Sequence, residues 1–255
     1  MGHKLAASLL ILSLAIMLMS TLAAGCTDRT WDYVALGDSF PAGLGVEKSY
    51  VDYYAELIEQ DLGVQVEVHN FSRNGQSTTV LLGRLRKSAE LRDAIQEAEV
   101  ITIWTGWNDL WQELELYRRE QCGGEDNLDC IREEVAGLKT DFDAVFDEIL
   151  SLTSVEDTHV LVGESGIPVV NSWNHYGWFD TLQGPCYEEW RAHLVKSADE
   201  RGIMVVYTYH TLNGPGGDER LDDRYLQSDG IHLTEEGHRL MADLHRAAGY
   251  GPLEP

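Results

Sequence analysis

Three side chains in this sequence have the types needed for nucleophilic catalysis, and each lies in a short polar segment. Ser39 ends a Gly-Asp-Ser turn that directly follows the apolar run 33–36. Asp229 and His232 lie three residues apart near the other end of the chain. Acyl transfer needs a nucleophile, a base that accepts its proton and a group that orients the base. Ser39 could attack, His232 could act as base and then as acid, and Asp229 could hold the imidazole Nδ1–H.

The same chemistry needs hydrogen-bond donors for the negative charge that develops on the carbonyl oxygen of the substrate. The backbone amides of Ser39 and Gly75 and the side-chain amide of Asn108 are the expected donors. A glycine lets the backbone approach a ligand closely. An asparagine is a neutral donor that does not compete as an acid. We therefore predict an oxyanion hole from these three residues.

The elements that must position these residues alternate between strand and helix patterns. Short apolar or alternating runs predict five strands at 33–36, 64–71, 100–104, 159–162 and 203–207. Helical spacing is found at 49–61, 78–97, 110–120, 131–152, 187–201 and 234–248, with loops expected at 163–185 and 208–228. Such alternation predicts an α/β domain whose parallel sheet is covered on both faces. The polar segments follow the strands, so we expect them to converge at one edge of the sheet.

Four segments together resemble the conserved blocks of the SGNH hydrolases, also called GDSL esterases/lipases. They are Gly37-Asp38-Ser39, Gly75, Gly106-Trp107-Asn108-Asp109 and Asp229-Gly230-Ile231-His232. The resemblance implies a flavodoxin-like, three-layer α/β/α fold with a mostly parallel sheet of about five strands. It also implies ester hydrolysis through an acyl-enzyme without a metal or cofactor. In this reading Ser39 is the nucleophile, His232 the base and Asp229 its orienting group, with Ser39, Gly75 and Asn108 as the oxyanion hole. Phe40 departs from the pattern, which commonly has leucine there.

Several nearby polar residues have simpler explanations. Asp38 is expected to form a turn or cap a helix, and Asp109 to cap the helix that begins at Leu110. Five histidines lie in predicted strands or helices and are expected to be structural or exposed: His69, His159, His193, His238 and His245. His175 and His210 lie in predicted loops near the same edge, without a partner that the sequence can name.

Aromatic residues are the best candidates for substrate contact. Trp107 could form the floor of the pocket or simply pack under its loop. Trp173, Tyr176 and Trp178 lie close together in the predicted loop 163–185. They could hold an acyl chain, stack on a sugar or touch a membrane, or they could form a small separate core.

The first 25 residues are typical of a secretory signal. His3 and Lys4 precede an uncharged apolar run, and small residues then lead to Cys26. This ending resembles the lipobox of bacterial lipoproteins, in which Cys26 would carry lipid. Plain secretion and a retained anchor are the alternatives. We therefore predict a signal peptide at 1–25 and a single hydrolase domain at 26–255, in an exported protein that is secreted or tethered to a membrane.

The other three cysteines are Cys122, Cys130 and Cys186. Cys122 and Cys130 flank a short polar loop and could close it, whereas Cys186 could be buried, free or paired with an unlipidated Cys26. The chain has no CxxC pair, which argues against a structural zinc site.

Charge narrows the classes of partner. The formal net charge is −24, with 19 Lys and Arg against 43 Asp and Glu. Such a surface repels phosphate backbones and argues against nucleic acid as a partner.

The sequence thus predicts a secreted or lipid-anchored serine esterase that hydrolyses carboxylic esters, with acetylated glycans as the first candidate substrates. Lipid or lysophospholipid esters and thioesters are alternatives, and acyl transfer to an alcohol would use the same residues. A protein of another class, a lipoprotein that binds glycan or lipid without catalysis, would have no need of both a nucleophile and a base.

Overall fold

A five-stranded sheet forms the centre of the computed structural model, which describes residues 29–164, 168–176 and 178–253. The residues from Trp31 onward form one compact unit, which contains the whole sheet except Thr30, the first residue of its first strand. The strands are β1 (Thr30–Gly37), β2 (Gln65–Asn70), β3 (Val100–Trp104), β4 (His159–Gly163) and β5 (Met204–Val206). Each of them falls on a predicted run.

The sheet has the strand order β2-β1-β3-β4-β5, and β1 with β3, β3 with β4, and β4 with β5 pair in parallel. Every residue of β3 and β4 is buried, because these strands lie inside the sheet and are covered on both faces. The edge strand β2 instead alternates between exposed and half-buried residues. This difference explains why β3 reads as a continuous apolar run whereas β2 alternates.

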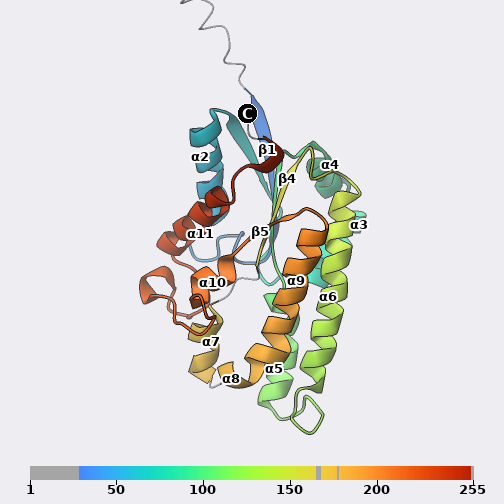
Figure 1. The fold of residues 1–255 in the computed structure, drawn as a ribbon, viewed down its shortest axis with the longest axis vertical. Coiled ribbons are helices and arrows are strands. Elements are labelled where there is room, and N and C mark those ends of the chain that lie inside the picture. Colours follow the sequence, from blue (N-terminus) through green and yellow to red (C-terminus); the bar gives the residue numbers. More distant parts are fainter. Residues whose placement is uncertain (1–28, 165–167, 177, 254–255) are drawn as a thin grey trace, which may run out of the picture. The chain divides into compact units, whose positions relative to one another are not determined.

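Helices cover both faces of the sheet (Figure 1). On one side, α2 (Tyr50–Leu62) packs against α11 (Glu235–Ala247). On the other side, α6 (Asp129–Leu150) packs against both α3 (Thr78–Lys87) and α9 (Glu189–Glu200). The predicted three-layer α/β/α fold with five mostly parallel strands is confirmed.

The segment 78–97, predicted as one helix, consists of α3 and α4 (Ala89–Glu97). Ser88 separates them with an extended backbone conformation. Its N–H donates to the carbonyl of Arg84 (2.9 Å), and its Oγ accepts the N–H of Leu91 (3.3 Å). Ser88 therefore caps the end of one helix and the start of the next, a role that helical spacing of apolar residues does not reveal.

Both long loops that the sequence predicts contain helices. α7 (Val169–Tyr176) and α8 (Phe179–Leu182) lie within 163–185, and α10 (Thr208–Asn213) lies within 208–228. Helices this short are not stable alone. They are held by tertiary bonds: Val170 N–H donates to Asn213 Oδ1 (3.1 Å), and Asn171 exchanges two bonds with the backbone of Leu221 (2.8 and 3.0 Å). Such partners, about 40 to 50 residues apart, leave no local signal.

A disulfide between Cys122 and Cys130 closes the loop between α5 (Trp111–Arg118) and α6. The sequence allowed this pairing without deciding it. Cys26 and the side chain of Cys186 lie outside the described part of the structure. Among the helices that the structure describes, none is both long and apolar enough to cross a membrane.

Candidate active site

Ser39 lies in the turn at the carboxyl end of β1. The N–H of Asp38 donates to the carbonyl of Trp104 on β3 (3.1 Å), which continues the sheet bonding past the end of the strand. The carboxylate of Asp38 accepts the N–H of Phe40 (3.1 Å) and shapes the turn. Asp38 thus forms the turn as predicted, and Ser39 is held at the end of a rigid strand with 8% of its surface exposed.

Ser39, His232 and Asp229 form a continuous chain of hydrogen bonds. Ser39 Oγ lies 2.9 Å from His232 Nε2, and His232 Nδ1 lies 2.6 Å from Asp229 Oδ2. The other carboxylate oxygen of Asp229, Oδ1, accepts the N–H groups of Ile231 (2.9 Å) and His232 (3.0 Å). With both oxygens of Asp229 engaged, the carboxylate has a defined orientation toward the imidazole.

The segment that carries Asp229 and His232 is a tight turn. Its ends are joined by the bond from Gln227 N–H to the carbonyl of His232 (2.8 Å) and by a bridge between Leu226 and Leu233. The sequence placed this segment just past the fifth strand, but β5 ends at Val206 and α10 intervenes. Convergence with Ser39 therefore depends on this turn rather than on a strand end.

Gly75 and Asn108 face the same pocket as Ser39. Gly75 has a φ of +72°, and no atom lies within 4 Å of the position that a Cβ would take. The backbone at Gly75 is therefore open to a ligand. Asn108 Nδ2 donates to the carbonyl of Gln76 (3.2 Å) and lies 3.4 Å from Asp38 Oδ2. These contacts orient the amide of Asn108 beside the serine turn.

Sequence reasoning missed Gln76, which connects the two halves of this donor set. The side chain of Gln76 is buried, and its Nε2 donates to the carbonyl of Gly37 (2.8 Å). The backbone carbonyl of Gln76 accepts the hydrogen bond from Asn108 Nδ2. Arg84 holds the Oε1 of Gln76. A glutamine next to Gly75 has no distinguishing pattern in a single sequence, so only the fold reveals this role.

Asp109 was expected to cap its own helix, and that expectation was wrong. Its carboxylate accepts the N–H of Thr78 (2.9 and 3.0 Å) and the hydroxyl of the same residue (3.1 Å), at the start of α3. It therefore ties the segment that carries Asn108 to a helix about 30 residues earlier. Burial raises the pKa of Asp109 to about 6, although these hydrogen bonds lower it.

The two aspartates nearest the serine and histidine differ in their electrostatics. Burial raises the pKa of Asp229, but hydrogen bonds from the His232 side chain and from two backbone N–H groups outweigh it, so the pKa lies below its ordinary value. Burial raises the pKa of Asp38 to about 7, against the N–H of Phe40, which lowers it. Asp229 is thus suited to remain ionised beside an imidazolium, whereas Asp38 is not.

Asp38→Asn is expected to flatten the pH dependence of stability. The carboxyl titrates near pH 4 in the unfolded chain, so between about pH 4 and pH 7 the folded state binds the proton more tightly. The wild type therefore loses stability as pH rises through this window, and the variant lacks that loss. Thermal unfolding at pH 5 and pH 8 should show a smaller fall in Tm for Asp38→Asn. Asp223→Asn, at an 86% exposed side chain, is the control. Parallel pH profiles for wild type and Asp38→Asn would contradict the prediction.

The pocket above Ser39 has a volume of about 400 Å³. Its lining residues come from each of the predicted segments and from α5: Asp38, Ser39, Phe40, Gly75, Trp107, Asn108, Trp111, Ile231 and His232. Trp107 thus lines the pocket while remaining 8% exposed, and Trp111, which the sequence did not single out, is an exposed wall. Trp178 lines a neighbouring pocket. The side chains of Trp173, Tyr176 and His175 lie outside the described part of the structure.

The remaining histidines whose side chains the structure describes have structural partners. Tyr50 N–H donates to Nδ1 of His238 (3.1 Å), and the ring of His245 stacks on that of Tyr50 (4.7 Å between centroids). Burial lowers the pKa of both imidazoles to about 4. His210, for which the sequence named no partner, lies 3.0 Å from the carboxylate of Glu164, which is fully buried just past β4.

One group of metal-ligand types occurs among the residues that the structure describes. Asp32, Glu67 and His69 bring ligand atoms within 4.8 Å of one another on β1 and β2. His69 Nε2 is bonded to Asp32 Oδ1 (2.7 Å). None of these residues lines the pocket above Ser39.

A comparison with known protein families shows to which family this chain belongs. The sequence model of the GDSL-like lipase/acylhydrolase family matches residues 35–240. The chain belongs to this family. All of the site residues described above lie within the matched range, and the family assignment that the sequence motifs indicated is confirmed.

Individual relatives of this GDSL-like hydrolase extend over nearly its whole length. The spore germination lipase LipC of Bacillus licheniformis is 28% identical over 228 residues, which are 88% of this chain and 99% of that protein. The lipase Lip_vut3 from a goat rumen metagenome is 27% identical, with a TM-score of 0.71 over 88% of this chain and all of that one. The acetyl xylan esterase AlAXEase shares the fold, with a TM-score of 0.59 at 17% identity over 86% of this chain and 99% of that one. This GDSL-like hydrolase is a carboxylic ester hydrolase.

Proposed function

We propose that this enzyme hydrolyses carboxylic esters through a serine nucleophile, with Ser39, His232 and Asp229 as its catalytic triad. The observation that carries the proposal is the hydrogen-bonded chain from Ser39 Oγ through His232 to Asp229, at 2.9 and 2.6 Å. These distances are within reach for direct proton transfer between the hydroxyl and the imidazole. The partial exposure of Ser39 and the 400 Å³ pocket above it allow an ester to reach the hydroxyl.

In the first half of the reaction, Ser39 Oγ attacks the carbonyl carbon of the ester and transfers its proton to His232 Nε2. The oxyanion that forms accepts hydrogen bonds from the amides of Ser39 and Gly75 and from Asn108 Nδ2. Asp229 stabilises the imidazolium and holds its Nδ1–H. When the tetrahedral intermediate collapses, the bond to the alcohol oxygen breaks, and His232 protonates the leaving alcohol.

The second half returns the enzyme to its starting state. Water donates a proton to His232 Nε2 as its oxygen attacks the acyl-enzyme, and the same donors hold the second oxyanion. Collapse releases the carboxylic acid and returns the proton to Ser39 Oγ. An alcohol that entered in place of water would give transfer of the acyl group instead, so product analysis with an added alcohol separates the two outcomes.

Asn108→Ala is expected to lower kcat by about 10²- to 10³-fold, with little change in KM, because a side-chain oxyanion donor acts mainly in the transition state. The side chain of Asn108 bonds to the backbone carbonyl of Gln76 and lies beside Asp38. Alanine removes only this side-chain donor, and the backbone amides of Ser39 and Gly75 remain as donors. Steady-state kinetics on a short p-nitrophenyl ester measure the effect.

Asn74→Ala, at an exposed residue that lines neither the pocket above Ser39 nor the neighbouring pocket, is the control. A kcat for Asn108→Ala within a few-fold of wild type would remove Asn108 from the oxyanion hole.

We further propose that the protein is exported and that Cys26 tethers it to a membrane. The signal-like segment 1–25 supports this proposal, and so does the disulfide between Cys122 and Cys130, because disulfides persist mainly in oxidising compartments. Mass spectrometry of the mature N-terminus tests it. Lipid on an N-terminal Cys26 is the expected result, and a chain that starts after Cys26 would overturn the tether.

A further inference from the structure

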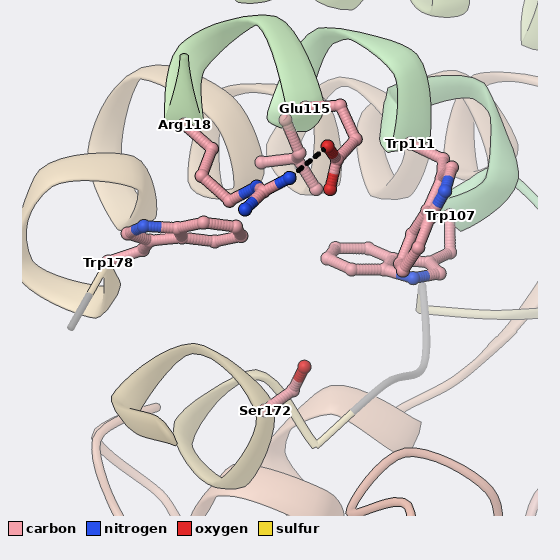
Figure 2. A pocket seen from close by; sticks show the side chains of 7 residues that line it. Trp107, Trp111, Glu115, Arg118, Ser172 and Trp178 are labelled. Atoms are coloured by element: carbon pink, nitrogen blue, oxygen red, sulfur yellow. Dashed lines mark hydrogen bonds and ion pairs between the residues drawn. The ribbon is translucent and has the colours of Figure 1, made fainter. Parts of the chain in front are cut away.

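A second pocket adjoins the one above Ser39. It has a volume of about 270 Å³ and lies between α5 with its preceding turn on one side and α7 with Trp178 on the other. Figure 2 shows Trp107 and Trp111 at one end of this cavity and Trp178 with Arg118 at the other, while Ser172 projects from the opposite wall. Leu114 completes the wall that α5 provides. The surface that lines the cavity is therefore mostly apolar.

Among the residues that the structure describes, the two pockets share two tryptophans and no other lining residue. Trp107 and Trp111 line both of them, whereas His232 and Ile231 line only the pocket above Ser39. The second cavity thus adjoins the site on the side of the tryptophans, away from the histidine.

This arrangement distinguishes the two halves of an ester. In the proposed reaction, the oxygen of the alcohol takes its proton from His232 Nε2, so the alcohol must lie on the side of His232 and Ile231. The oxyanion points toward Gly75 and Asn108. The remaining substituent of the carbonyl carbon is the acyl chain, and the direction left to it is toward Trp107 and Trp111.

We infer that the second pocket binds the acyl chain of the substrate and makes the enzyme selective for straight acyl chains of medium length. The inference rests on the proposed function, because it uses His232 as the group that protonates the alcohol. An apolar lining with three tryptophans and a leucine gains free energy from each methylene group that it buries. An acetyl group has no methylene to place there.

The volume of the cavity sets the length of the acyl chain that it can hold. A methylene group takes up about as much space as a water molecule, roughly 30 Å³. At that size the cavity of 270 Å³ has room for about nine carbons, so an acyl chain of eight carbons fits inside it. Arg118 and Glu115 form an ion pair (2.8 Å) on the wall that α5 provides, with Arg118 beside Trp178 and Glu115 between Arg118 and Trp111. The volume of the cavity is therefore what limits the length of the acyl chain.

Ser172 offers a way to block the cavity from the wall opposite α5. Its small side chain is 5% exposed and points into the cavity. Ser172→Phe would place a ring in the space that the acyl chain needs. Gln112→Ala is a matched control, because Gln112 is an exposed residue of α5 that lines neither pocket.

Two isomeric esters test which half of the substrate enters the cavity: methyl octanoate, with a long acyl chain, and heptyl acetate, with a long alcohol. We expect wild type to hydrolyse methyl octanoate with a kcat/KM at least about tenfold higher. Ser172→Phe should lower the ratio of the two values by about tenfold or more, and Gln112→Ala should leave it as in wild type. A ratio near one in wild type, or a selective loss of heptyl acetate hydrolysis in Ser172→Phe, would overturn the inference.

A second measurement needs no variant. For p-nitrophenyl esters of straight acids, kcat/KM of wild type should rise about two- to fourfold with each added methylene and stop rising near eight carbons. A maximum at acetate would overturn the inference, and so would faster hydrolysis of acetylated xylose than of methyl octanoate. If no ester is turned over and an organophosphonate does not label Ser39, the proposed function itself fails. Turnover of every ester without chain-length preference would overturn only the acyl pocket.

Discussion

Replacing Ser39 with alanine is expected to lower kcat for ester hydrolysis by about 10⁵- to 10⁶-fold, the magnitude seen when a serine nucleophile is removed from a triad. The hydroxyl of Ser39 lies 2.9 Å from the imidazole of His232, and it is the atom that would form the acyl-enzyme. Alanine keeps the backbone amide of the turn and removes only this atom. Hydrolysis of p-nitrophenyl octanoate by purified wild type and variant measures the loss.

The control for this variant is Ser151→Ala, at an exposed serine that follows α6. It should hydrolyse the ester as wild type does. Mass spectrometry after treatment with an organophosphonate gives an independent readout, with one adduct on Ser39 in wild type and in Ser151→Ala and none there in Ser39→Ala. Undiminished turnover by Ser39→Ala would refute the mechanism. Failure of folded wild type to form the adduct would favour a protein that binds glycan or lipid without catalysis.

The second large effect is expected for Asp229→Asn, which should lower kcat by about 10⁴-fold, as for other triads in which an amide replaces the carboxylate. Asp229 Oδ1 accepts two backbone N–H groups, so the carbonyl of an asparagine would take that place and its NH₂ would face His232 Nδ1. An NH₂ group cannot accept the Nδ1 proton. The imidazole would therefore carry its proton on Nε2, where it could no longer accept the proton of Ser39.

This prediction specifies a tautomer, so it can be tested by more than a rate. Nitrogen NMR of the imidazole should show the proton of His232 moving from Nδ1 in wild type to Nε2 in Asp229→Asn. Asp223→Asn, at an exposed aspartate six residues earlier, should change neither the rate nor the tautomer. A near-normal kcat in Asp229→Asn would show that orientation of His232 by Asp229 is not required. Water would then be the group that replaces the carboxylate, since 45% of the Asp229 side chain is exposed.

The proposed acyl pocket and the proposed triad lead to different expectations, so the experiments separate them. Ser39→Ala and Asp229→Asn should affect every ester to a similar extent, because they act on the reacting atoms. Ser172→Phe should instead change the preference between esters. The preference for acetylated glycans, expected first from the sequence, stays a prediction that the chain-length series will decide.

Much of the strand framework and the site could be predicted because both depend on local patterns. The sequences of β1 and β3 read as continuous apolar runs, because both faces of these strands are buried. The sequence of the edge strand β2 alternates between apolar and polar residues, because only one of its faces is covered. The segments with Ser39, Gly75 and Asn108 follow those strands directly. In a parallel sheet this order alone brings them to one edge.

The parts that could not be predicted depend on partners far away in the chain. Asp109 was expected to cap its own helix but binds Thr78 at the start of another. Gln76, buried beside the serine turn, has no pattern that distinguishes it. The short helix α7 is held by bonds to distant partners, because Val170 N–H donates to Asn213 of α10 and Asn171 bonds to the backbone of Leu221. Such partners leave no local pattern from which α7 or α10 could be predicted.

What the sequence by itself determined is the set of residues on which the proposed chemistry depends: a serine, a histidine, an aspartate and three amide donors, with a parallel sheet to bring them together. These features follow from residue types and from periodicities of a few residues. What only the tertiary structure decided is the space around that chemistry. The cavity between α5 and α7 is lined by residues from 107 to 178, and its shape depends on how helices without local signals pack. Packing over such separations is a property of the folded chain, and in our proposal it selects the ester.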